Sequence, residues 1–136
     1  MNLLKTIPAL PIRDIEKATD FYQDRFGFTV GYRDDGFAIV TRDAVEVHLW
    51  AASDESWKGR EPETTAQPIK SGAETFIAGT ASCRIEVEDI DKLYEEFKRS
   101  GVLYNTNTIV ESKPWGTREF PALDQDRNLI TFYQRQ

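Results

Sequence analysis

Apolar and polar residues alternate along 83–87 and then change to the spacing of a helix. Cys83, Ile85 and Val87 occupy every second position, which is the period of a strand with one buried face. The next apolar positions are spaced by three and four, the pattern of a helix with one buried side; they are Ile90, Leu93, Tyr94 and Phe97. Asp89 stands where its side chain can cap the first amides of that helix. The pattern predicts a strand followed directly by a capped helix.

A second copy of this strand–helix unit lies near the N-terminus. Residues 14–17 read Asp-Ile-Glu-Lys, and residues 89–92 read Asp-Ile-Asp-Lys. An apolar stripe follows in both copies, and each helix is expected to end near a glycine, Gly27 or Gly101, because glycine readily adopts the conformation that closes a helix. This self-similarity predicts one structural module repeated in tandem.

The remaining segments complete each module as β-α-β-β-β. The first module, about 5–51, is expected to contain a helix at 14–26 and strands at 5–13, 28–32, 37–41 and 45–50. Pro8 and Pro11 interrupt the first strand, and proline is confined to sheet edges and irregular points. In the second module, about 81–134, strands are expected after the helix at 108–111, 118–123 and 129–133.

The sequence therefore predicts one α+β domain, 1–136, built from two modules and a connecting loop. The loop, 52–80, is polar, and Trp57, Phe76 and Ile77 are the large apolar residues expected to anchor it. A connection of this length in a compact domain is either functional or partly mobile.

The strand faces opposite the expected core carry unusual mixtures of side chains. Glu46, His48 and Trp50 share one such face, and Arg84 and Glu86 share another. Large aromatic rings beside charges favour a cleft for an amphipathic ligand. The alternative is an ordinary solvated face with Trp50 at a dimer interface.

Composition narrows the classes of partner. The net charge of −6 argues against nucleic acid, which is bound by basic patches, and is compatible with a cationic ligand. Neither an apolar run of about 20 residues, as a membrane span needs, nor a signal peptide is present. The single cysteine, Cys83, is expected to be an inert core thiol. These features predict a cytoplasmic protein without a membrane partner.

Four stretches, taken together, carry a family resemblance. They are I-P-A-L-P-I-R-D at 7–14, F-Y-Q-D-R-F-G-F at 21–28, D-G-F-A-I-V at 35–40 and P-W-G-T-R-E-F-P-A-L-D at 114–124. With the duplicated module, they resemble the bleomycin-resistance family of the vicinal-oxygen-chelate superfamily, and the match covers the chain outside 52–80. That superfamily also contains glyoxalase I, extradiol dioxygenases and fosfomycin-resistance enzymes. The resemblance implies a curved mixed sheet with a ligand cleft.

The superfamily contains both metal enzymes and metal-free binders. The enzymes resemble one another in placing His, Gln or Glu at cleft positions that correspond here to Ile7, Ser82 or Cys83, and Thr131. Only His48, on the fourth strand, carries a side chain able to ligate there, and a divalent cation needs three or more donors. We therefore expect no metal, no cofactor and no catalysis. A glyoxalase-like or fosfomycin thiol transferase activity remains the alternative.

The resemblance implies binding and sequestration of bleomycin-type glycopeptide antibiotics, free or metal-chelated, without chemical modification. Phe37 matches the family's stacking phenylalanine, and Trp115 matches its stacking tryptophan, which comes from the other subunit. The acidic residues expected near the cationic tail of the drug are Asp34, Asp35, Glu46 and Glu86. The other expected lining residues are Tyr32, His48, Trp50 and Arg84. A binder of some other aromatic cation is a further alternative.

The resemblance also implies a homodimer. Pro8 matches the proline at which the family's N-terminal strand crosses to the partner, so that two clefts would each be built from both chains. One position departs from the family pattern: the last turn usually carries Pro and Gly, whereas residues 124–128 read Asp-Gln-Asp-Arg-Asn. Arg127, long and cationic, could repel a cationic tail there.

Overall fold

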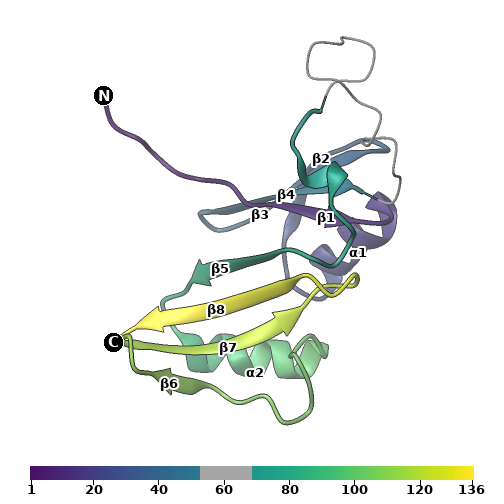
Figure 1. Ribbon diagram of the computed structural model, residues 1–136. Coiled ribbons are helices and arrows are strands. Elements are labelled where there is room, and N and C mark those ends of the chain that lie inside the picture. Colours follow the sequence, from purple (N-terminus) through teal and green to yellow (C-terminus); the bar gives the residue numbers. More distant parts are fainter. Residues whose placement is uncertain (53–68) are drawn as a thin grey trace.

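The computed structural model describes residues 1–52 and 69–136, and it confirms the two tandem modules (Figure 1). The first module contains β1 (Ala9–Ile12), α1 (Ile15–Asp24), β2 (Thr29–Arg33), β3 (Phe37–Arg42) and β4 (Val45–Ala51). The second contains β5 (Ser82–Glu86), α2 (Ile90–Ser100), β6 (Glu111–Lys113), β7 (Thr117–Leu123) and β8 (Leu129–Arg135). Within the connecting segment, the described part forms a short 3-10 helix, η2 (Ala73–Thr75). Trp57 lies outside the described residues.

Each module forms its own four-stranded mixed sheet, with strand order β1-β4-β3-β2 in the first and β5-β8-β7-β6 in the second. The first strand of each module pairs in parallel with the last, and the other neighbours are antiparallel. β1 is therefore an edge strand, which accommodates Pro11 because one side of an edge needs no ladder hydrogen bond.

Both helices begin as the sequence predicts. Asp14 accepts a hydrogen bond from the Lys17 amide, and Asp89 accepts one from the Lys92 amide. Gly101 ends α2 in the left-handed conformation with φ 75°. A capping carboxylate at the N-terminus of a helix also interacts favourably with the helix dipole. The repeated Asp-Ile pair therefore fixes where each helix starts.

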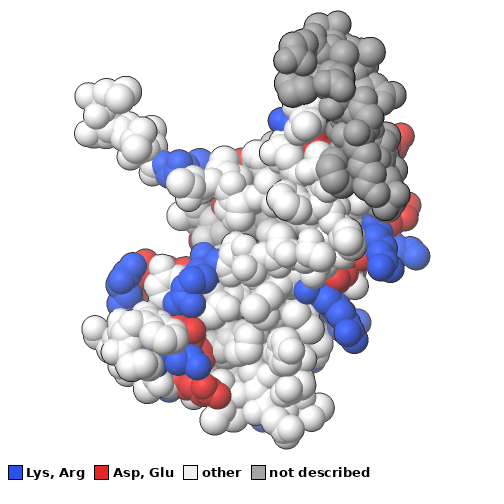
Figure 2. All heavy atoms as spheres, viewed as in Figure 1, with Lys and Arg blue, Asp and Glu red and all other residues white. Residues whose placement is uncertain are grey.

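Two expected strands differ in the structure. The strand expected at 108–111 is wrong: β6 covers Glu111–Lys113, because Thr108 closes a turn in which its hydroxyl accepts from the Asn105 amide. The first strand is shorter than 5–13, since β1 begins after Pro8. Residues 1–8 instead form an arm that is uncharged toward its free end and basic near its base (Figures 1 and 2). The free end stands clear of the body, whereas the Pro8 carbonyl at the base accepts a hydrogen bond from the His48 amide.

The two modules share one hydrophobic core. The ring of Phe26 packs edge-on against Phe97 at 5.3 Å, and Phe97 packs against Phe132 at 5.0 Å. Arg42 adds a polar link, because its guanidinium donates to the Phe26 carbonyl and to both carboxylate oxygens of Glu96. In the described ranges no helix is long and apolar enough to cross a membrane.

A buried polar network also joins the modules at the turn before β8. Asp124 accepts hydrogen bonds from the Tyr22 hydroxyl and from the side-chain and backbone nitrogens of Asn128. The Asn128 amide in turn donates to the Pro11 carbonyl on β1. Burial raises the pKa of Asp124. Arg127 adopts φ 72° in this turn, the left-handed conformation that glycine adopts without strain.

Candidate ligand-binding surfaces

Four rings form a continuous aromatic cluster on the outer face of β2, β3 and β4; they are Tyr32, Phe37, His48 and Trp50. The Phe37 ring lies 4.4 Å from Trp50, 5.1 Å from His48 and 5.9 Å from Tyr32, measured between centroids. Register explains the grouping, because Phe37 pairs with Trp50 across β3 and β4, and side chains directly opposite share a face. The opposite face of β4 carries Val47 and Leu49, both fully buried, so the predicted alternation is confirmed.

A charged edge borders this aromatic cluster. Glu46 lies 2.6 Å from His48 Nε2 through one carboxylate oxygen and accepts from Lys5 Nζ at 2.9 Å through the other. The hydrogen bond from Lys5, followed by the contact with His48, lowers the pKa of Glu46. Because Lys5 belongs to the N-terminal arm, this ion pair ties the base of the arm to the edge of the cluster.

The β2–β3 turn places the two expected aspartates differently. Asp34 accepts from the Tyr32 hydroxyl at 2.8 Å and from the Gly36 amide at 2.9 Å, and these bonds lower its pKa. Asp35 is exposed and lines a polar hollow together with Asp34, Arg13 and Glu16, but no hydrogen bond or ring contact within the described residues joins it to the aromatic cluster. Asp34 is thus attached to the aromatic cluster, whereas the structure does not bring Asp35 to it.

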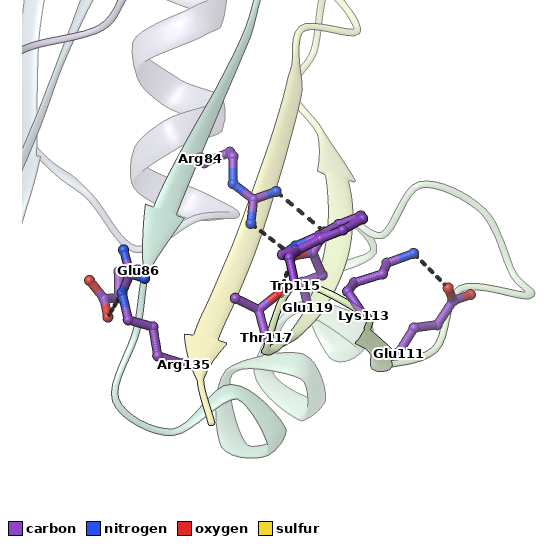
Figure 3. A network of polar contacts seen from close by, with 8 residues as sticks. All are labelled: Arg84, Glu86, Glu111, Lys113, Trp115, Thr117, Glu119 and Arg135. Atoms are coloured by element: carbon purple, nitrogen blue, oxygen red, sulfur yellow. Dashed lines mark hydrogen bonds and ion pairs between the residues drawn. The ribbon is translucent and has the colours of Figure 1, made fainter.

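A second cluster lies on the outer face of the other sheet and is centred on Glu119 (Figure 3). Its carboxylate faces both guanidinium nitrogens of Arg84, at 2.8 and 3.3 Å, across the intervening strand β8. The hydroxyl of Thr117 donates to the same carboxylate at 2.7 Å, and the indole nitrogen of Trp115 donates to it at 3.4 Å. The Arg84 guanidinium is the main cause that lowers the pKa of Glu119 to about 2.

Tyr133 continues this Glu119 cluster along β8. The Arg84 guanidinium lies 4.6 Å from the centre of its ring, and that of Arg135 lies 5.7 Å from it. Arg135 also pairs with Glu86 at 3.2 Å. The negative charge of Glu86 is therefore already compensated within the chain, and its pairing in a half-exposed position contributes little to stability.

Arg84, Glu86 and Trp115 are among the site residues expected from the sequence, whereas Glu119 is not. The sequence did contain a signal for Glu119. Thr117 and Glu119 alternate with apolar Phe120, the pattern of a strand with one polar face, and in the structure Glu119 pairs with Tyr133 on β8. The contact with Arg84, however, crosses a whole strand and depends on the order of β5, β8 and β7.

The two clusters lie on different sheets of the chain. Among the contacts of residues 1–52 and 69–136, no hydrogen bond, ion pair or ring contact joins the aromatic cluster to the Glu119 cluster. A cavity of about 460 Å³ does lie between the modules, lined by Phe28, Phe97 and Phe132 with the Arg42–Glu96 pair beside them. Of the predicted site residues its lining includes only Glu86, which pairs with Arg135 at the margin of the Glu119 cluster; the cavity therefore borders that cluster and includes no residue of the aromatic cluster.

The positions that correspond to metal ligands in superfamily enzymes are spread over both sheets. Ser82 pairs with Leu129, Thr131 pairs with Arg84, and His48 lies in the other module beside Ala9. Within the described ranges, no group of three or more His, Cys, Asp or Glu side chains could hold a metal ion. Cys83 is half-buried against the core, and burial raises the pKa of its thiol to about 11. A thiol held in its neutral form is a poor metal ligand and nucleophile.

Comparison with known proteins supplies the family. Residues 6–132 match the model of the glyoxalase/bleomycin resistance protein/dioxygenase superfamily. The chain is 49% identical over 133 residues to the bleomycin resistance protein of Geobacillus stearothermophilus, covering 98% of each, and equally identical to that of Staphylococcus aureus.

Solved structures agree with this match. The bleomycin-binding protein of bleomycin-producing Streptomyces verticillus, in complex with copper(II)-bleomycin, has a TM-score of 0.75 and 25% identity, covering 100% of this chain and 99% of that one. The bleomycin resistance determinant encoded on the transposon Tn5 shares the fold, with a TM-score of 0.71 at 23% identity, covering 98% and 99%. The chain therefore belongs to the glyoxalase/bleomycin resistance protein/dioxygenase superfamily, as its duplicated module and motifs predict.

Proposed function

We propose that this protein confers antibiotic resistance by binding bleomycin-type glycopeptides and sequestering them without chemical change. The observation that carries the proposal is the aromatic cluster, a half-exposed set of four adjoining rings on the wet face of a sheet. Flat rings at such a surface suit a planar heteroaromatic group, because aromatic pairs gain about 0.5–1.5 kcal/mol beyond area burial. The relatives at 49% identity that are named bleomycin resistance proteins support the choice of ligand.

The site is complete only in a dimer. Phe37 of one chain and Trp115 of the other would lie on opposite sides of the drug, because within one chain these residues belong to clusters on different sheets. Exchange of the N-terminal arms would join the two chains, and the arm presents the exposed apolar side chains of Met1, Leu3 and Leu4 for this purpose. Twofold symmetry then gives two equivalent clefts.

The charges beside the aromatic cluster suit a cationic drug tail. Asp34 and Glu46 are both ionised at neutral pH, because hydrogen bonds from their neighbours lower the pKa of each. Lys5 partly offsets Glu46, so Asp34 supplies the less compensated charge. Asp35 and Glu86 contribute at longer range, where salt screens the attraction. Arg127, in the turn before β8, makes no hydrogen bond, ion pair or ring contact with either cluster among residues 1–52 and 69–136; its backbone N–H donates to the Asp124 carbonyl within the turn.

Sequestration requires no bound metal, cofactor or turnover. Capture takes place in the cytoplasm, before the drug reaches DNA, and the protein itself binds neither nucleic acid nor membrane. The donor set around His48 supports a metal-free site, since its near neighbours are Glu46 and aromatic rings. A bound drug that carries its own chelated metal would need no protein ligand for that metal.

Titration of the purified protein with bleomycin tests this proposal. We expect quenching of tryptophan fluorescence that saturates at one drug per chain, and recovery of unmodified drug as measured by mass spectrometry. A chemically altered drug, or turnover after addition of Mn²⁺, Ni²⁺ or Zn²⁺, would favour the enzymatic alternative. Equal affinity for a simple planar aromatic cation would instead identify a broader class of ligand.

A further inference from the structure

Trp115 has one polar anchor among the described residues. Its side chain is 63% exposed in the turn between β6 and β7, and it makes no ring contact with residues 1–52 or 69–136. Figure 3 shows its indole lying over the Glu119 carboxylate, to which Nε1 donates a hydrogen bond at 3.4 Å. An exposed tryptophan without such a bond would populate several rotamers, and a ligand would have to order it on binding.

The anchor itself is rigid. Glu119 is only 7% exposed, and its oxygen Oε2 also accepts from Thr117 at 2.7 Å and from Arg84 at 2.8 Å. Arg84 is held in turn over the ring of Tyr133. A buried carboxylate with this many charge-assisted bonds has little freedom to move, so it can fix the direction of a group bound to it.

We infer that Glu119 is the positioning residue of this surface: it holds the indole of Trp115 in one orientation before any ligand arrives. The effect of this positioning on drug affinity rests on the proposed function. The fixed orientation of the Trp115 indole in the ligand-free protein does not. Preorganisation raises affinity because the cost of fixing a side chain is met during folding.

The geometry predicts that two substitutions change the Trp115–Glu119 hydrogen bond in opposite directions, which a general structural role of Glu119 would not predict. Trp115 makes the longest of the three bonds to Oε2, and it competes with Thr117 for that oxygen. Removing the Thr117 hydroxyl should therefore strengthen the bond from Trp115. Replacing Glu119 by Gln should weaken it, because a neutral amide oxygen is a poorer acceptor than a carboxylate.

The test uses the indole N–H resonances of the ¹⁵N-labelled, ligand-free protein, with the Trp115 signal assigned by its loss in Trp115→Phe. We expect Glu119→Gln to move that signal upfield and to speed its exchange with water. Thr117→Val should move it downfield and slow its exchange. The control is Glu111→Gln, the same chemical change at the position directly opposite Glu119 on β6, which should leave the signal in place.

An unchanged Trp115 signal in folded Glu119→Gln would overturn the inference, as would an unchanged or upfield signal in Thr117→Val if the first variant fails to fold.

Bleomycin titration tests the consequence of this positioning for drug affinity. Glu119→Gln should bind about 3- to 10-fold more weakly, the scale of one hydrogen bond, and combining it with Trp115→Phe should add no further loss. Additive losses in that pair would contradict the inference. Absence of drug binding by the wild-type protein would refute the proposed function, while the ligand-free spectra would still decide the role of Glu119.

Discussion

The hydroxyl of Tyr22 on α1 donates a 3.0 Å hydrogen bond to the carboxylate of Asp124, in the other module, 102 positions along the chain. Both residues are buried, with exposures of 0% and 4%. Burial, and secondarily the nearby carboxylate, raises the pKa of Tyr22, so the phenol remains a donor throughout the physiological range. The bond therefore joins the two halves of the duplicated fold at neutral pH.

Replacing Tyr22 by Phe should destabilise the protein by about 1–2 kcal/mol, because Asp124 then loses a donor in a site closed to water. Urea unfolding measures this change. Tyr32→Phe is the matched control, since that hydroxyl bonds to Asp34 at the surface, and its effect should stay within about 0.5 kcal/mol. Equal losses in the two variants would show that burial of the Tyr22 bond is unimportant.

Stability should depend on Glu119 in a defined pH window. Its pKa of about 2 in the folded protein lies below the ordinary value of 4.5, so its contribution is complete above about pH 4.5 and is lost as the pH falls through about 2. At pH 6 the free energy of unfolding of the wild-type protein should exceed that of Glu119→Gln by about 1–2 kcal/mol. This figure allows for solvent screening at the half-exposed Arg84. Urea unfolding at pH 6, 4, 3 and 2 should show the difference disappearing. A constant difference would exclude this ionisation as its source.

Gly79 should tolerate no side chain. It adopts φ 85°, and a Cβ there would meet the backbone carbonyl oxygen of Asp126 far inside van der Waals contact. Gly79→Ala should cost about 2–4 kcal/mol, from overpacking together with backbone strain. Gly72→Ala separates the two effects, because Gly72 has φ 94° with open space around its Cβ position, and it should cost only about 1 kcal/mol. Thermal unfolding of both variants makes the comparison.

Trp115→Ala should weaken bleomycin binding by about 10- to 100-fold while leaving the chain folded, since removal of a central aromatic contact commonly costs 2 kcal/mol or more. Fluorescence titration would now read Trp50 and Trp57. Tyr104→Ala, which removes another exposed ring outside both clusters, should retain wild-type affinity. Wild-type affinity in Trp115→Ala would remove that residue from the site.

Deleting residues 1–4 should convert the proposed dimer to a monomer and abolish tight drug binding. The chain should still fold, because β1 begins at Ala9 and keeps its pairing with β4. Light scattering after gel filtration gives the mass. Asn2→Ser, which keeps the apolar side chains of Leu3 and Leu4, should remain dimeric. An unchanged mass after deletion would show that the arm does not hold the dimer together.

Local patterns predicted most of the fold. The Asp-Ile pairs at 14–15 and 89–90 placed both helix starts, because capping depends only on residues three positions apart. Strand alternation separated Val47 and Leu49 from His48 and Trp50 for the same local reason. The strand expected at 108–111 failed because the Thr108 side chain closes a turn there, and threonine has a high strand propensity that this bond overrides.

The site was predicted less completely than the fold. The family resemblance placed Trp115 among the expected site residues, and the structure shows this side chain exposed. The Arg84–Glu119 pair and the Tyr22–Asp124 bond could not be predicted, because each joins residues whose proximity depends on sheet order or on the packing of one module against the other. Asp124 in particular lies in a polar segment, 124–128, that is typical of an exposed turn, although its carboxylate is buried.

The packing of Phe26 against Phe97 and Phe132 sets how the molecule can come apart. Neither module encloses a hydrophobic core of its own. Cleavage of the chain between the modules would therefore leave each fragment with an exposed apolar surface. Melting is then a single all-or-none event rather than two separate ones. An isolated half could escape this only by associating with another copy of itself, reproducing between molecules the arrangement that duplication provides within one.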